Sequence, residues 1–360
     1  MKSRLPIPLW TAAAPVVAWL LLAGVFMGLS GPFYLFVAVG LIAGVLAAVH
    51  HAEVVAHRVG EPFGTLVLAI SVTAIEVALI VSLMLAGGPD AATLARDTVF
   101  AAVMIILNGI VGLCLIMGGA RFREQKFGLF GVSASLATLA AIVVLTLVLP
   151  NHTTSHAGPV YSTSQLAFVA IVSAGLYGVF VMVQAVRHRD YFLAPSTGDG
   201  EEVHAAPPTV RATTLSAILL LVCLGAVVLL AKALAPSIEA GVLAAGAPKA
   251  LVGVIIAGVV LLPEGVAALR AARANRLQTS LNLALGSALA SIGLTIPVVA
   301  TVSIATGLQL TLGIDQKSTV LLLLSLFVTG QSLGTGRTTV LQGAVLLVLF
   351  ATYLFTTIVP

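Results

Sequence analysis

Long apolar stretches alternate with short polar segments along all 360 residues of this chain. A helix that crosses the hydrocarbon core of a bilayer needs about 20 mostly apolar residues. The pattern therefore predicts an all-α integral membrane protein with about eleven transmembrane helices. We expect the spans at roughly 9–29, 34–49, 63–85, 98–119, 127–149, 165–186, 214–234, 248–269, 278–304, 318–333 and 339–358.

The composition supports this class, because 59% of the residues are hydrophobic and 8% are charged, whereas a soluble domain has about 25% charged residues. The basic residues lie in short segments without a patch of interleaved aromatics, which argues against a nucleic-acid partner. Cys114 and Cys223 lie inside apolar stretches and are expected to be core residues rather than metal ligands. Membrane lipid is the expected surrounding, and the oligomeric state stays open.

The distribution of Lys and Arg predicts the orientation, because cytoplasmic loops carry the basic excess. With the N-terminus inside, 13 of the 17 basic residues fall in inside segments and 4 outside. We expect an inner (plasma) membrane protein with a cytoplasmic N-terminus and an external C-terminus. The outside residues are Arg96, Lys232, Lys249 and Lys317.

The longest polar stretch, 187–213, contains Pro, Gly and acidic residues and predicts a cytoplasmic linker between two halves. We expect residues 34–186 and 214–360 to be two repeats of five helices, preceded by an extra helix in 1–33. The halves are related by five spans, an odd number, so the two copies would cross the membrane in opposite directions. Such inverted repeats usually hold the ion site between them, near the midplane.

Two glutamates, Glu76 and Glu264, each lie near the middle of an apolar span. A carboxylate at that depth is costly and is normally kept for ion or proton handling. The following span of each half repeats the pattern N-x3-G-x6-G. It occurs as Asn108, Gly112 and Gly119, and again as Asn282, Gly286 and Gly293.

A pair of buried carboxylates can be neutralised by a divalent cation, by monovalent cations or by protons, which is the chemistry of a cation/proton exchanger. Hard cations need additional oxygen ligands. Asn108 and Asn282 are candidates, although hydrogen bonds between helices would also explain them. Further candidates are the Thr73 hydroxyl, one turn before Glu76, and the Val259 carbonyl, which loses its amide donor because residue 263 is proline. Ser71, Ser287, Ser291, Gly112 and Gly286 are expected chiefly to pack helices.

A second polar cluster lies at 50–62, where His50, Glu53 and His57 would share one face of a helix. It could attract metal ions or protons at a cytoplasmic entrance. A solvated turn next to the membrane is the alternative interpretation.

The segments HAEVVAHRVGEPFGTLVLAISVTAIEV, LLPEGVAAL, NRLQTSLNLALGSALASIGLTIPVV and TGRTTVLQGA resemble the bacterial ChaA-type calcium/sodium–proton antiporters of the cation/Ca2+ exchanger superfamily. The resemblance covers residues 34–358. It implies a ten-helix exchanger core in which Glu76 and Glu264 bind the ion and Asn108 and Asn282 lie in the paired following helices.

The two halves depart from a symmetric pattern. Thr73 precedes the first glutamate by one turn, where the second half has Leu261. Pro263 directly precedes the second glutamate, where the first half has Ile75. The two half-sites are therefore chemically unequal.

These features predict a secondary active Ca2+/H+ antiporter without an organic cofactor. A monovalent Na+ or K+/H+ antiporter using the same site is the first alternative, and a cation channel is a distant second. No metalloprotease motif or phosphate-binding loop indicates an enzyme.

The inverted repeat predicts that a cysteine placed at Ser155 reacts with an impermeant thiol reagent from outside and one at Gly198 from the cytoplasm. Parallel labelling of the unsubstituted protein is the control, since it contains Cys114 and Cys223. If both new cysteines react from the same side, the five-helix inverted repeat is wrong.

Overall fold

The computed structural model describes residues 7–60, 63–193 and 208–359, and almost all of them are helical. The helices of the first half are α1 (Leu9–Phe26), α2 (Phe33–Val59), α3 (Phe63–Gly87), α4 (Leu94–Met104), α5 (Val111–Phe122), α6 (Leu129–Val143) and α7 (Thr163–Met182). Those of the second half are α8 (Val210–Ala244), α9 (Ala250–Val260), α10 (Leu262–Arg273), α11 (Leu277–Thr306), α12 (Gln316–Leu333) and α13 (Val340–Ile358). Two short antiparallel strands, β1 (Gln125–Lys126) and β2 (Arg337–Thr338), pair with each other.

The helical membrane fold is confirmed, but the count of eleven spans is not. Within the described residues nine helices are long and apolar enough to span a membrane, or ten if α9 and α10 form one bent span. The predicted span that fails this test is α12, whose ends carry Gln316, Lys317 and Gln331. These polar residues lower its mean hydropathy although the helix forms over the expected residues.

The second helix differs most from its predicted bounds. The sequence predicts a span over 34–49, whereas α2 continues to Val59 and includes the polar cluster. The run from His50 to Val59 contains no Gly or Pro, and the helix ends where Gly60 adopts a φ of 76°. Glycine accepts this left-handed value without steric cost. Residues 50–59 of the cluster are therefore helical, and residues 61–62 lie outside the described residues.

The predicted single span at 248–269 is broken, because α9 and α10 meet at Leu261 with a bend of 55°. Pro263 at the start of α10 has no amide hydrogen to donate to the Val259 carbonyl. A proline of this kind is a usual cause of a sharp kink. The break therefore follows from the residue that the sequence singled out.

The predicted linker, 187–213, lies largely outside the described residues. Its described ends are a 3₁₀ turn at Arg189–Tyr191 and the first turn of α8, which starts at Val210. The predicted external loop at 150–164 begins in a 3₁₀ turn, Leu149–His152, and pairs through Val160 with Thr311.

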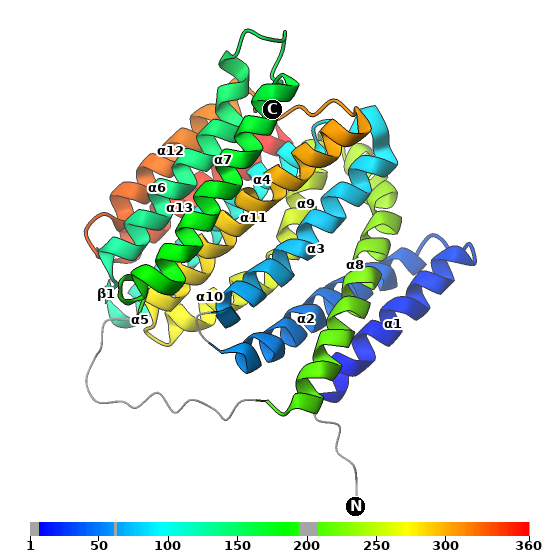
Figure 1. Cartoon of the computed structure of the whole chain (residues 1–360), viewed down its shortest axis with the longest axis horizontal. Coiled ribbons are helices and arrows are strands. Elements are labelled where there is room, and N and C mark those ends of the chain that lie inside the picture. Colours follow the sequence, from blue (N-terminus) through cyan, green and yellow to red (C-terminus); the bar gives the residue numbers. More distant parts are fainter. Residues whose placement is uncertain (1–6, 61–62, 194–207, 360) are drawn as a thin grey trace, which may run out of the picture. The chain divides into compact units, whose positions relative to one another are not determined.

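The chain forms two compact units, and each draws on both predicted halves. The smaller unit contains residues up to Ser82 together with 199–252. In it α2 packs along α8, and α1 packs against both (Figure 1). A Cβ atom at Gly44 of α2 would lie 3.1 Å from Val227 of α8, so this glycine permits the close approach.

The larger unit contains residues 83–198 and 253–360. Its helices α6, α7, α11 and α12 run side by side (Figure 1), and α5 packs on α13. The pair α5–α13 joins the fourth and eleventh predicted spans, and the pair α7–α11 joins the sixth and ninth. These are equivalent pairs if the halves are repeats.

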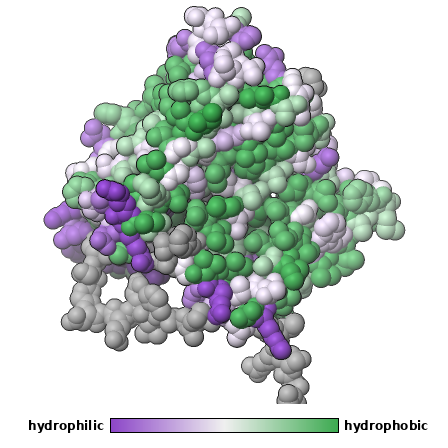
Figure 2. All heavy atoms as spheres, viewed as in Figure 1, coloured by the Kyte–Doolittle hydropathy of each residue, from purple (hydrophilic) through white to green (hydrophobic). Residues whose placement is uncertain are grey.

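The exposed surface carries many large apolar side chains, as expected for a protein surrounded by lipid. Phe26, Leu35 and Ile171 are each at least 70% exposed. Figure 2 shows hydrophobic residues over most of the viewed face, with hydrophilic residues gathered in small groups.

The contact between α5 and α13 generates a prediction about stability. A Cβ atom at Gly343 would lie 2.7 Å from both Gly112 O and Ile116 N, which are backbone atoms that cannot rotate away. We expect Gly343→Ala to destabilise the protein by about 1–3 kcal/mol through overpacking, measured as a lower melting temperature in detergent. Gly175→Ala in α7, where no atom lies within 4 Å of the added Cβ, is the matched control. Equal melting temperatures for the two variants would contradict this close packing.

Candidate ion-binding site

Glu264 lies at the third position of α10, directly after the bend. Both of its carboxylate oxygens are buried. The N-terminus of a helix carries a partial positive charge, which stabilises a carboxylate in the first turn. The break between α9 and α10 therefore places an acidic group at a helix start inside the protein.

Asn108 is completely buried in a π-helical segment, Ile105–Ile110, between α4 and α5. Its side-chain nitrogen donates a hydrogen bond of 2.9 Å to Ser325 Oγ on α12 and one of 3.7 Å to Met104 Sδ. Its carbonyl oxygen, Oδ1, is buried and has no hydrogen-bond partner in the described part of the chain. Single π-helical turns are frequent at functional sites.

The larger unit brings these two groups to neighbouring segments. The first turn of α10 packs against the π-helical segment, where a Cβ atom at Gly265 would lie 3.3 Å from Ile110 Cδ1. Glu264 precedes Gly265, and Asn108 lies two residues before Ile110. A buried carboxylate and a buried amide oxygen thus come from adjoining turns, and oxygen atoms of these two kinds are ligands for hard cations.

Glu76 belongs to the smaller unit and lies in the middle of α3, where 4% of it is exposed. Thr73, one turn earlier, is 4% exposed and lies on the same face of the helix. Ser71 donates its hydroxyl hydrogen to Val67 O at 2.7 Å, which ties it to its own helix. Thr73 and Glu76 thus lie together on one buried face of α3, whereas the Ser71 hydroxyl is already bonded to a backbone carbonyl of its own helix.

Asn282 lies in a different environment from Asn108. Its nitrogen donates to Phe192 O at 2.6 Å, and its oxygen accepts from Gln278 at 2.9 Å. Asn282 is the sixth residue of Leu277–Thr306, whereas Asn108 is the fifteenth of Leu94–Phe122. The fifteenth residue of the later helix is Ser291, which is 2% exposed. By position along the helix, Ser291 rather than Asn282 is the counterpart of Asn108.

Of the remaining candidate residues, Gly112 packs closely against another helix, whereas Gly286 makes no close contact with another helix. Gly112 lies against α13, with Gly343 O 3.2 Å from an added Cβ. An added Cβ at Gly286 would meet no atom within 4 Å, and Ser287 on the same helix is half-buried. The Val259 carbonyl lies at the bend, and its role as a ligand stays a prediction.

The three residues predicted to form a cytoplasmic entrance, His50, Glu53 and His57, differ in their exposure. Glu53 and His57 are exposed, whereas the His50 ring packs at 5.8 Å from Trp10 of α1. The adjacent His51 is fully buried in the smaller unit, bonded to Thr11 O at 3.0 Å and to Ser216 Oγ at 3.3 Å. His51 thus joins α1, α2 and α8. The pair of successive histidines in an apolar helix is the sequence signal for this buried histidine, but the sequence does not indicate which of the two is buried.

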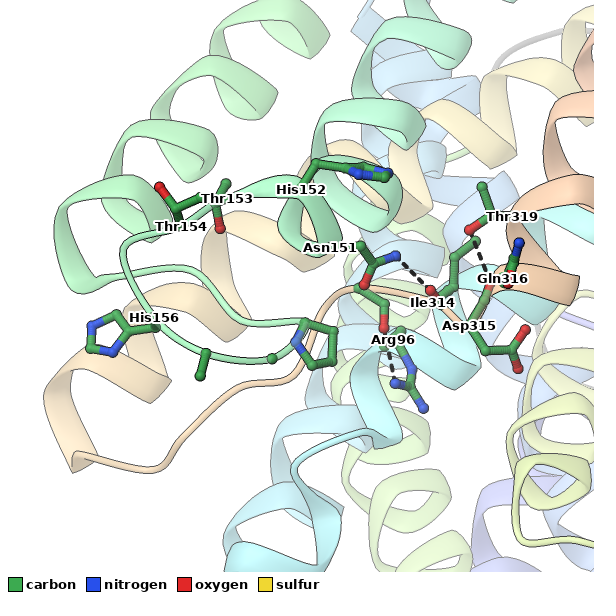
Figure 3. Close-up of a pocket in the computed structure, with 14 residues that line it drawn as sticks. Arg96, Asn151, His152, Thr153, Thr154, His156, Ile314, Asp315, Gln316 and Thr319 are labelled. Carbon is green, nitrogen blue, oxygen red and sulfur yellow. Dashed lines mark hydrogen bonds between the residues drawn. The ribbon is translucent and has the colours of Figure 1, made fainter.

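A cavity elsewhere in the larger unit lies at the loop between α6 and α7. It has a volume of about 850 Å³. Figure 3 shows Arg96 and Asn151 bonded to the carbonyls of Gly313 and Ile314, respectively, with His152 near Asn151 and His156 at the other end of the pocket. None of the predicted ion-binding residues lines this cavity, so it is separate from the candidate ion-binding site.

Comparison with known proteins gives one family and full-length relatives. The family described as "Sodium/calcium exchanger protein" matches residues 30–186 and 215–359. A putative ionic transporter, y4hA, of Sinorhizobium fredii is 50% identical and covers 100% of both chains. The sodium-potassium/proton antiporter ChaA of Escherichia coli is 38% identical over 88% of this chain and 86% of that one. The solved structure of the Ca2+/H+ antiporter protein YfkE has a TM-score of 0.72 at 19% identity, covers 98% of each chain, and supports the fold.

Proposed function

Because this chain belongs to the sodium/calcium exchanger protein family, we propose that it is a secondary active antiporter that exchanges Ca2+ for protons. Membership in the family supports a multi-pass membrane transporter of inorganic cations. The observation that carries the proposal is the buried carboxylate of Glu264 next to the segment that holds the buried oxygen of Asn108.

In the proposed mechanism the carboxylates of Glu76 and Glu264 bind either a cation or protons. Two carboxylates in an apolar interior cannot both stay charged without compensation. A divalent cation neutralises the pair directly, with Asn108 Oδ1 and the Thr73 hydroxyl as neutral ligands. Protons neutralise it in the other half of the cycle, so binding of one occupant displaces the other. Alternating access then carries each occupant across the membrane.

A monovalent Na+ or K+/H+ antiporter is the second candidate, because the relative from Escherichia coli is named for those ions. The neutral amide of Asn108 supports this alternative, since it adds an oxygen ligand without adding negative charge. The same carboxylates would then bind a monovalent ion.

The experiment that separates the candidates uses inside-out vesicles from the inner membrane, in which the N-terminus is proposed to face the medium. An imposed pH gradient is followed by a fluorescent dye while Ca2+, Na+ or K+ is added. Ca2+/H+ exchange predicts collapse of the gradient by Ca2+ at lower concentrations than by Na+ or K+. Collapse by Na+ or K+ alone would support the second candidate.

The carboxylates generate a mutational prediction. We expect Glu76→Gln and Glu264→Gln each to reduce exchange to the background rate while the protein still inserts, because one charge is too few for a divalent ion. The measurement is cation-dependent collapse of the pH gradient, with membrane content checked by immunoblot. Glu239→Gln is the matched control, because the Glu239 side chain is 41% exposed and bridges to Lys249 at 2.7 Å. Exchange near the wild-type rate in either site variant would remove the central claim.

Competition at one site predicts how affinity depends on pH. Lower pH favours the proton-bound state, so the apparent affinity for Ca2+ should rise with pH and then level off. On the acidic side the change should approach about tenfold per pH unit for each proton displaced. Equilibrium binding to the purified protein in detergent, from about pH 5 to 9, measures it; an affinity that is constant throughout contradicts a shared site.

A further inference from the structure

We propose that Ser325 of α12 is a positioning residue for the cation site, which holds the Asn108 amide so that its carbonyl oxygen is presented to the transported cation. The proposal rests on the antiporter function proposed above. It adds to the site a helix that carries neither glutamate and neither of the repeated asparagines.

The hydrogen bonds of Asn108 fix which way its amide faces. Nδ2 donates to Ser325 Oγ at 2.9 Å and to Met104 Sδ at 3.7 Å. An amide nitrogen only donates, and a thioether sulfur only accepts. Met104 therefore selects the nitrogen over the oxygen, and Ser325 sets the plane of the amide. Oδ1 is left on the side opposite these two acceptors.

The burial of Oδ1 indicates that this orientation serves a ligand. The oxygen is shielded from solvent and has no hydrogen-bond partner among the described residues. Most buried polar atoms are paired, and an exception calls for an explanation such as an ion that binds there. The first turn of α10, which carries the buried carboxylate of Glu264, packs on the same π-helical segment.

The character of α12 fits this role. Ser325 is 0% exposed, and Thr329, one turn further along the same face, is also 0% exposed. The helix packs against the π-helical segment and against α6. It thus directs hydroxyl groups to the interior while Phe327 on its outer side is 64% exposed. Buried hydroxyls are common where membrane helices pack, and Ser325 is distinguished by its hydrogen bond from Asn108.

The test is a double-mutant cycle of Ser325→Ala, Asn108→Ala and the double variant. In the vesicle assay we expect Ser325→Ala to raise the half-saturating cation concentration about fivefold, the effect of one net hydrogen bond, with the maximal rate nearly unchanged. The double variant should equal Asn108→Ala, because Ser325 acts through Asn108. Ser325→Thr keeps the hydroxyl and should restore affinity. Ser173→Ala, at a buried serine of α7, is the control and should leave affinity unchanged.

Two results would overturn the proposal: wild-type affinity in Ser325→Ala, or effects of the single variants that multiply in the double variant. The same cycle is read by equilibrium binding of Ca2+, Na+ and K+ to the purified full-length protein. If wild-type vesicles show no cation-dependent collapse of the pH gradient, the antiporter function fails. The binding cycle still decides whether Ser325 positions Asn108.

Discussion

The cost of burying a carboxylate in an apolar interior is the constraint on which the rest of this structure depends. For Glu264 this cost is reduced by its position in the first turn of α10, because the dipole of that helix favours a negative charge at its start. The helix can start there because Pro263 breaks the preceding hydrogen-bond ladder and the chain bends by 55°. Local sequence, helix geometry and electrostatics thus act together at two adjacent residues, Pro263 and Glu264.

Close packing around this turn limits how far its surroundings can relax. The absence of a side chain at Gly265 leaves room for Ile110, and its absence at Gly343 leaves room for the backbone of α5 at Gly112. These contacts hold the π-helical segment between the first turn of α10 and α13. Asn108 is consequently fixed at both its backbone and its amide nitrogen. A ligand oxygen that is already oriented loses little conformational entropy when a cation binds.

If the two halves are repeats, their polar residues differ at equivalent positions. One has Thr73 before its glutamate and Asn108 in the following helix, and the other has Pro263 and, at the corresponding level, Ser291. Asn282 is engaged instead with Phe192 O and Gln278. Two repeats of one fold would therefore not need the same ligands, because helix packing fixes the backbone while the contacts of each side chain depend on its own neighbours.

The sequence by itself determined the membrane class, the approximate positions of the helices and the family, and it predicted two glutamates as ion-binding residues, since hydropathy and a charge within an apolar span are local properties. It also indicated that Pro263 leaves the Val259 carbonyl without an amide donor, but it predicted one continuous span there rather than two helices bent by 55°. It could not determine that α2 continues to Val59, which of two histidines is buried, or that Ser325 bonds to Asn108. The spacing N-x3-G-x6-G paired Asn108 with Asn282, whereas position along the helices pairs it with Ser291. Only the tertiary structure decides these points, because a hydrogen bond between residues 217 positions apart depends on how helices pack and not on spacing along the chain.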